Sequence, residues 1–278
     1  MERAGPIDTG PLFAPLHAEL VALLRGLSPA DWDRPTVAGA WLVRDVAAHI
    51  LDSSLRRLSM QRDGHRPPAG TRIEGYQDLV EYLNRLNADW VRVARRFSPA
   101  VLVELLEVSG PELSKLLASL PLHGPALFPV AWAGEDASEN WFDVGREYTE
   151  WWHHQAQIRD AVAAPPLASR RFLHPVLELS LYAVSVALRD AKAAEGAVVL
   201  VRIDGEAGGV WSVRREAGRW LLYRGGCDAP ALAVRLTADD AWRLFFNALP
   251  PEQAAARVVR EGDPELGARF LAVRGVMV

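Results

Sequence analysis

The sequence has 278 residues, of which 50% are hydrophobic and 24% are charged, and its formal net charge is −4. This is the composition of an ordinary globular protein, and the length predicts two domains. A mildly acidic chain lacks the basic face that nucleic acids and anionic membranes attract, so neither is expected as a partner.

The cellular location is predicted from the cysteine count and the hydropathy. One cysteine, Cys227, cannot form an internal disulfide, which favours a reducing compartment. The first residues contain no apolar core of signal-peptide length, and no stretch approaches the roughly 18 apolar residues of a membrane span. We expect a cytoplasmic protein without a membrane span, either a monomer or a homodimer.

The first 166 residues have the apolar spacing of helices. Apolar residues recur every three or four positions, and Ser98 followed by Pro99 is a helix start signal. A turn-rich loop over residues 63–70 separates two of these helices. We predict a helical bundle domain over residues 1–166, a four-helix bundle with one extra helix. The predicted helices span residues 13–27, 41–60, 76–97, 98–120 (with a bend at Gly110–Pro111) and 138–163.

The remaining residues, 167–278, have a different pattern. One more helix is predicted over residues 170–194, followed by short β-rich runs separated by glycines. Thr237 and Asp263 are expected to cap two final helices. The fold class is therefore α plus α+β, with a small antiparallel sheet covered by helices in the second domain. The predicted strands span residues 198–203, 210–213, 220–223 and 231–236.

The segment 142–160 places polar side chains on an inward helix face. At about 100° per residue, Glu147, Glu150 and His154 share the face marked as inward by Ile158 and Ala161. Buried carboxylates need a compensating partner, and a metal cation is one. Glu150 and His154 lie one turn apart and can reach the same ion.

A third ligand is expected from another helix, and His49 is the best candidate. Asp45 and Asp52 flank it and would orient its ring. His153 points about 100° away from His154 and is interpreted as a flanking residue. Spacing alone leaves a simpler alternative open, because a buried histidine is more often a core residue and Glu-x-x-x-His is a common intrahelical pair.

Two stretches resemble a known family. Residues 41–49, Trp-Leu-Val-Arg-Asp-Val-Ala-Ala-His, and the segment 142–160 are similar to the DinB-like metal-binding bundle superfamily, and more closely to the mycothiol-dependent maleylpyruvate isomerase family. The resemblance implies that His49, Glu150 and His154 bind zinc. It also implies a C-terminal domain of the sterol-carrier type, and a thiol cofactor such as mycothiol.

The leading hypothesis is a thiol-dependent isomerase or transferase. Zinc, or nickel, would deprotonate a low-molecular-weight thiol, and the thiolate would attack a small electrophile or an unsaturated dicarboxylate. Arg56 would hold a substrate carboxylate. One alternative is a metal-dependent hydrolase with Glu147 as the base. Another is a non-catalytic protein that binds metal or a small molecule.

Overall fold

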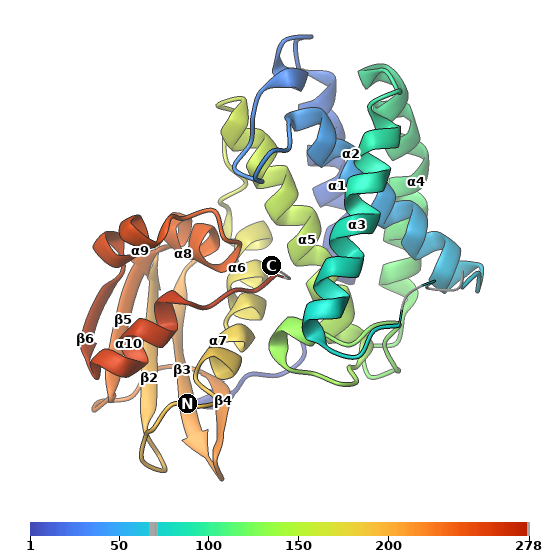
Figure 1. The fold of residues 1–278 in the computed structure, drawn as a ribbon. Helices are drawn as coiled ribbons and strands as arrows, with labels where there is room; N and C mark the ends of the chain where they lie inside the picture. The colour runs from blue at the N-terminus through green and yellow to red at the C-terminus, as the bar shows by residue number, and fades with distance from the viewer. Residues whose placement is uncertain (67–69, 71, 277–278) are drawn as a thin grey trace.

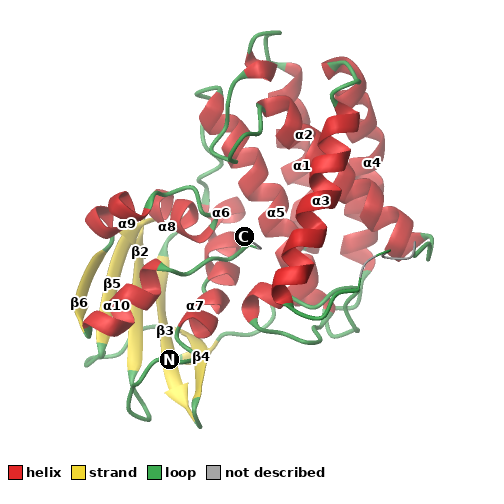
Figure 2. Cartoon of the chain, in the orientation of Figure 1, coloured by secondary structure: helices red, strands yellow, loops and turns green. Residues whose placement is uncertain are grey.

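The computed structural model describes residues 1–66, 70 and 72–276, and it divides into a helical part and a part built around a sheet (Figure 1). The helices of the first part lie side by side, and the strands gather at the other end of the molecule (Figure 2). This confirms the predicted fold class. The bundle helices are α1 (Phe13–Arg25), α2 (Val43–Arg57), α3 (Tyr76–Ala94), α4 (Pro99–Ser119) and α5 (Asn140–Ala161).

Helix α2 lies at the centre of the bundle and packs against α3, α4 and α5. The predicted start of α4 is confirmed, because the Ser98 hydroxyl accepts a hydrogen bond from the Val101 amide at 3.3 Å. Helix α4 then continues without interruption through Gly110 and Pro111. Short helical segments link these helices: η1 (Gly10–Leu12), η2 (Asp31–Asp33), the π-helix η3 (Leu58–Arg62) and η4 (Ala131–Ala133).

The loop predicted over residues 63–70 begins where η3 ends. Asp63 is the C-terminal cap of η3, and Gly64 has a positive φ of 70°, as a turn requires. Residues 67–69 of this loop lie outside the described residues.

The sheet of the second part is mixed rather than purely antiparallel, which corrects the sequence-based expectation. Strands β2 (Val198–Asp204) and β5 (Leu232–Thr237) run parallel, with Val199 opposite Leu232. The other pairs are antiparallel, and the strand order is β1-β4-β3-β2-β5-β6. The bounds of the other strands are Glu2–Arg3 for β1, Gly209–Glu216 for β3, Arg219–Arg224 for β4 and Val259–Gly262 for β6. The chain between β4 and β5 passes beside Leu200 and Val210 at Gly226, so it crosses the sheet and returns to the far side of β2. Periodicity shows that strands exist, but this crossover sets their direction.

Four of the strands lie where the sequence predicts them, and two were missed. The predicted strands are β2 (Val198–Asp204), β3 (Gly209–Glu216), β4 (Arg219–Arg224) and β5 (Leu232–Thr237). The missed strands are β1 (Glu2–Arg3) and β6 (Val259–Gly262). Both are exposed at the sheet edges, so they lack the alternation of apolar and polar residues by which strands are recognised.

The helix predicted over residues 170–194 is two shorter helices, α6 (Arg170–Ser180) and α7 (Tyr182–Ala187). The Ser180 hydroxyl bonds the Val176 carbonyl, a local bond that competes with regular helix geometry. Helix α6 packs closely on α5, where a Cβ at Gly145 would lie 2.8 Å from Leu179. The last helices are α8 (Ala238–Phe245), α9 (Pro251–Arg257) and α10 (Pro264–Leu271), and α9 was not predicted.

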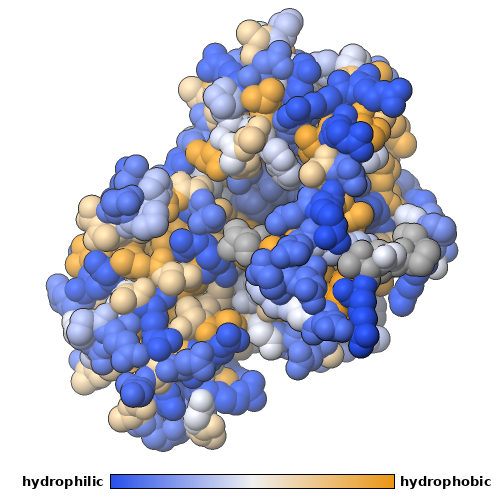
Figure 3. Space-filling view, viewed as in Figure 1, coloured by the Kyte–Doolittle hydropathy of each residue, from blue (hydrophilic) through white to orange (hydrophobic). Residues whose placement is uncertain are grey.

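One face of the sheet packs against these helices and completes the core. Val199, Val201 and Ile203 alternate with exposed or half-buried neighbours on β2, as a one-sided sheet requires. Polar residues dominate the face of the molecule in Figure 3, where apolar residues are scattered. Among the described residues, no helix is both long and apolar enough to cross a bilayer.

Candidate metal centre

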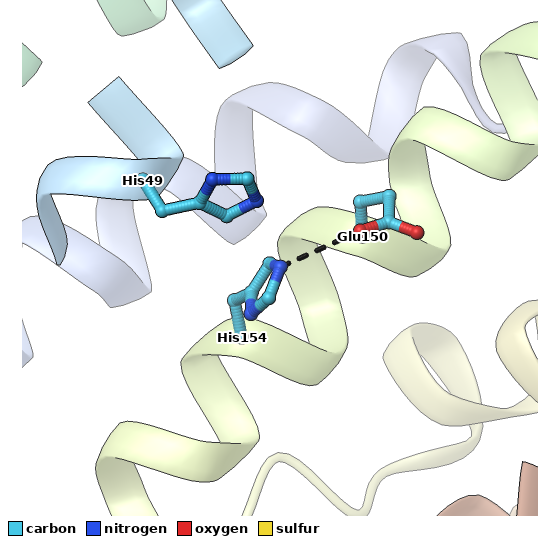
Figure 4. Close-up of side chains that lie close together, drawn as sticks. All are labelled: His49, Glu150 and His154. Carbon is cyan, nitrogen blue, oxygen red and sulfur yellow. Dashed lines mark ion pairs between the residues drawn. The ribbon is translucent and has the colours of Figure 1, made fainter. Parts of the chain in front are cut away.

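Three predicted ligands meet between α2 and α5. One possible donor atom from each of His49, Glu150 and His154 lies within 4.8 Å of the other two. His49 reaches across from α2 toward the pair on α5 (Figure 4). The Nε2 atom of His154 lies 3.4 Å from the Oε2 atom of Glu150. The helical geometry inferred from the sequence therefore places the three side chains together.

The donor set fits a divalent cation. Two imidazoles and a carboxylate form a catalytic zinc pattern, which leaves one position for an exogenous ligand. Bonds of about 2.0–2.1 Å in a tetrahedral site separate neighbouring donors by about 3.4 Å. The two histidines are buried, whereas the Glu150 side chain is 25% exposed. The site is therefore more open to solvent on the Glu150 side.

Gln157 fixes the orientation of the His154 ring. The Nδ1 atom of His154 lies 2.9 Å from the Oε1 atom of Gln157, one turn further along α5. With the amide oxygen as acceptor, Nδ1 carries the proton, and the lone pair is left on Nε2, which faces Glu150. A metal-binding imidazole needs this support on its second nitrogen.

The ring of His49 packs against Trp41, whose centroid lies 5.0 Å away, and meets the ring of His154 edge to face at 4.7 Å. The expectation that Asp45 and Asp52 orient His49 is wrong. Asp45 caps the start of α2 and pairs with Arg95, and Asp52 pairs with Arg56. Both carboxylates are held by stronger, charged partners. The buried Nδ1 atom of His49 has no hydrogen-bond partner among the described residues.

Burial sets the charge state of the site. It lowers the pKa of His49 well below the usual value, and the neighbouring His154 lowers it further. Burial alone would raise the pKa of the Glu150 carboxyl, but His153, His154 and Arg146 outweigh it, so this pKa falls below its ordinary range. A neutral His49 beside an ionised Glu150 is the protonation state that metal ligation needs.

His153 is buried next to the ligand set rather than pointing to solvent. Its Nδ1 atom donates to the Thr149 carbonyl at 2.9 Å, and its ring centroid lies 4.0 Å from that of His154. Burial lowers the pKa of His153 to about 3. Its ring also stacks on that of Phe246, from the second part of the chain. The interpretation of His153 as a flanking residue is consistent with this placement.

Glu147 and Arg56, the two predicted catalytic residues, are both held in ion pairs. Glu147 lies 3.2 Å from Arg146, which also binds Asp143 at 2.8 Å. Arg57 of α2 binds the same Asp143, so a buried network joins α2 to α5 beside the ligands. Arg56 pairs with Asp52 at 2.9 Å, but its side chain is 35% exposed and its charge reaches His49.

The family model of the mycothiol maleylpyruvate isomerase N-terminal domain matches residues 13–159, more than half of the chain. The chain belongs to this family. The resemblance inferred from residues 41–49 and 142–160 is thereby confirmed, and both stretches lie within or extend to the edge of the matched range. A search of the curated proteins finds no match for the sequence.

Solved structures agree with this assignment at the level of the fold. A crystal structure of the mycothiol-dependent maleylpyruvate isomerase aligns with a TM-score of 0.55 at 12% identity, covering 94% of this chain and 96% of that one. A mutant of that isomerase gives the same values. A sterol carrier protein 2 like 2 from Aedes aegypti aligns with 35% of this chain and 94% of its own, at 15% identity and a TM-score of 0.28, too low to bear on the fold.

Three residues at the site were missed by the sequence analysis. Gln157 lies three residues after His154, so helical spacing could have identified it as a support for that ring. Trp41 lies just before α2, in the stretch that carries the family resemblance. Phe246 had no sequence signal, because it meets His153 only through the packing of α8 on α5.

Proposed function

We propose that this member of the family is a metal-dependent enzyme that uses a low-molecular-weight thiol, as an isomerase or transferase of the maleylpyruvate isomerase type. The observation that carries the proposal is the convergence of His49, Glu150 and His154 from two helices within 4.8 Å. Family membership supports the thiol dependence, since the aligned isomerase is described as mycothiol-dependent.

The residues of this chain would hold the cation in a defined way. His49 offers a neutral imidazole, His154 offers its Nε2 atom, and Glu150 offers an ionised carboxylate. Gln157 holds the His154 ring by its Nδ1 proton. The chemistry that a divalent cation supplies here is deprotonation of a coordinated thiol at neutral pH. Zinc is the metal we expect first, and nickel also suits this donor set.

The substrate class we propose is a small electrophile or an unsaturated dicarboxylate. Arg56 would bind a substrate carboxylate, because its half-exposed guanidinium lies near His49. Its pairing with Asp52 leaves part of the guanidinium free for a second carboxylate, since a guanidinium has five N–H donors.

The hydrolase alternative needs Glu147 as a base for metal-bound water. In the structure the Glu147 carboxylate lies 3.2 Å from Arg146, so an ion pair already engages the group that would have to bind the proton of the water. The thiol-dependent function has the additional support of the family to which the chain belongs.

Metal analysis tests the ligand set. We expect wild-type protein, purified and loaded with zinc, to hold one equivalent, and His49→Ala and His154→Ala to hold far less. His123→Ala is the matched control, because His123 is exposed and pairs with Glu139 away from the site. Equal metal content in all four proteins would exclude the proposed centre.

A thiol panel tests the reaction class. Cobalt-loaded protein is titrated with mycothiol, glutathione and cysteine, and a sulfur-to-cobalt charge-transfer band is expected with at least one of them. The same thiol should then support isomerisation of maleylpyruvate by the zinc-loaded protein. A metal centre that binds no thiol would contradict the isomerase and transferase functions and favour the hydrolase.

A further inference from the structure

Helix α8 of the second part and the residue that follows it contact α5 at three places. Trp242 meets Trp152 edge to face at 5.8 Å, and Arg243 forms a two-point ion pair with Asp160, with distances of 2.8 and 3.2 Å. These contacts hold α8 at a fixed position along α5, on the stretch of α5 that carries the ligands.

The third contact touches the ligand set. Phe246, which follows the last residue of α8, stacks on His153 with a centroid distance of 4.5 Å and an interplanar angle of 15°. His153 in turn lies 4.0 Å from His154. Phe246 and His153 are each 4% exposed, so both rings are enclosed.

Phe246 is itself held in place by the end of the chain. The residue after it, Asn247, has a left-handed φ of 56°, which ends α8, and its Oδ1 atom accepts a hydrogen bond from Arg274 at 2.9 Å. The Gly275 amide donates to the Phe245 carbonyl at 2.8 Å. Phe246 therefore presents a fixed aromatic surface to α5.

We propose that Phe246 is a positioning residue of the metal centre: from the second part of the chain, it holds the His153–His154 pair so that the Nε2 atom of His154 faces the cation. The inference rests on the proposed metal site. The His153 ring is bonded to the Thr149 carbonyl and stacked on Phe246, so it is held in one orientation next to the His154 ring. All three proposed ligands lie in the bundle, but the orientation of the His154 ring depends on a residue that α8 carries at its end.

The test compares full-length variants at Phe246 with one at the neighbouring Phe245. Phe246→Leu removes the flat ring, Phe246→Tyr keeps it, and Phe245→Leu perturbs a fully buried residue that has no ring contact with the site among the described residues. Zinc affinity is measured by chelator competition, the visible spectrum of the cobalt-loaded protein reports ligand geometry, and thermal unfolding of the metal-free protein reports stability.

We expect Phe246→Leu to weaken zinc binding about tenfold, the lower end for residues that support metal ligands, and to change the cobalt spectrum. Phe246→Tyr should keep the zinc affinity and the cobalt spectrum of the wild type. Phe245→Leu should lower the stability and leave the cobalt spectrum unchanged. If Phe246→Leu does not fold, Arg243→Ala, which frees α8 from Asp160, carries the same expectation.

Two results would overturn the inference, and they are distinguishable. Wild-type affinity and spectrum in Phe246→Leu would remove the positioning role and leave the metal site intact. A wild-type protein that binds neither zinc nor cobalt would remove the proposed function and this inference together.

Discussion

The Nδ1 atom of His154 lies 2.9 Å from the Oε1 atom of Gln157, so a side chain with no charge selects the tautomer of a predicted metal ligand. The two residues belong to the same face of α5, one turn apart. His154 is therefore preorganised to present Nε2 before any cation arrives, and the support should be measurable as metal affinity.

Replacing Gln157 by leucine should weaken zinc binding by about 10- to 100-fold, the effect typical of residues that support metal ligands. Chelator competition measures it. Gln155→Leu is the matched control, because Gln155 bonds the Leu16 carbonyl instead and should affect stability only. Unchanged affinity in Gln157→Leu would show that the ring needs no such support.

Acid should destabilise the metal-free protein at pH values above the ordinary titration range of carboxylates. The pKa values of His49 and His153 in the folded protein lie below the ordinary value of about 6.5. Keeping these histidines neutral therefore costs no folding free energy above pH 6.5, and stability is lost as the pH falls from 6.5 towards 3, where His153 titrates. Each histidine should contribute a loss of about 1.4 kcal/mol at pH 5.5.

Urea unfolding at pH 7.5 and pH 5.5 measures this loss. His153→Gln should lose about 1.4 kcal/mol less than the wild type between the two pH values, since one titrating group is gone. The same pH dependence in both proteins would mean that the pKa of His153 is the same in the folded and unfolded states.

The buried network around Asp143 should be costly to break. The side chains of Arg57 and Asp143 are 2% and 0% exposed, and Asp143 also binds Arg146. Asp143→Ala leaves the buried Arg57 without its carboxylate partner and Arg146 with Glu147 alone, and it should lower the free energy of unfolding by about 3–5 kcal/mol. Denaturant unfolding measures this, and adding Arg57→Met should recover part of it. A loss below about 1 kcal/mol would show that water replaces the carboxylate.

Gly110 makes room for the buried His17. A Cβ at position 110 would lie closer than 3.0 Å to three atoms of the His17 ring, so Gly110→Ala should destabilise the protein by about 1–3 kcal/mol. Gly26→Ala is the control, because Gly26 has a φ of −83° and its Cβ would meet nothing nearer than 3.5 Å. The penalty should vanish in a His17→Ala background, and its persistence there would point to the backbone instead.

The helices and strands that could be predicted from the sequence are those whose buried apolar residues recur at a regular spacing. The helix expected over residues 76–97 is α3, Tyr76–Ala94, and the strand expected over residues 198–203 is β2. Strand β6 is exposed along its whole length and has no such repeat. The parallel pairing of β2 with β5 depends on a chain crossover, which no local pattern encodes.

The residues of the metal centre were likewise predictable only where a local pattern marks them. Glu150 and His154 were predictable because one helix carries both, and His49 because its own helix face is apolar. The contact of Phe246 with His153 joins positions 93 residues apart in the sequence and depends on how α8 docks. The partners of Asp45 and Asp52 were mispredicted because a helix cap and two arginines compete for their carboxylates.

The pairing of β1 with β4 has a consequence for the order of folding. Glu2 and Arg3 lie opposite Arg224 and Tyr223, so strand β1 finds its partner only after residue 224 has been synthesised. At about 5–20 residues per second, that is roughly ten to forty seconds of translation. The bundle helices can associate during this interval, but the first residues of the chain must wait, and a slowed ribosome should prolong their exposure to proteases.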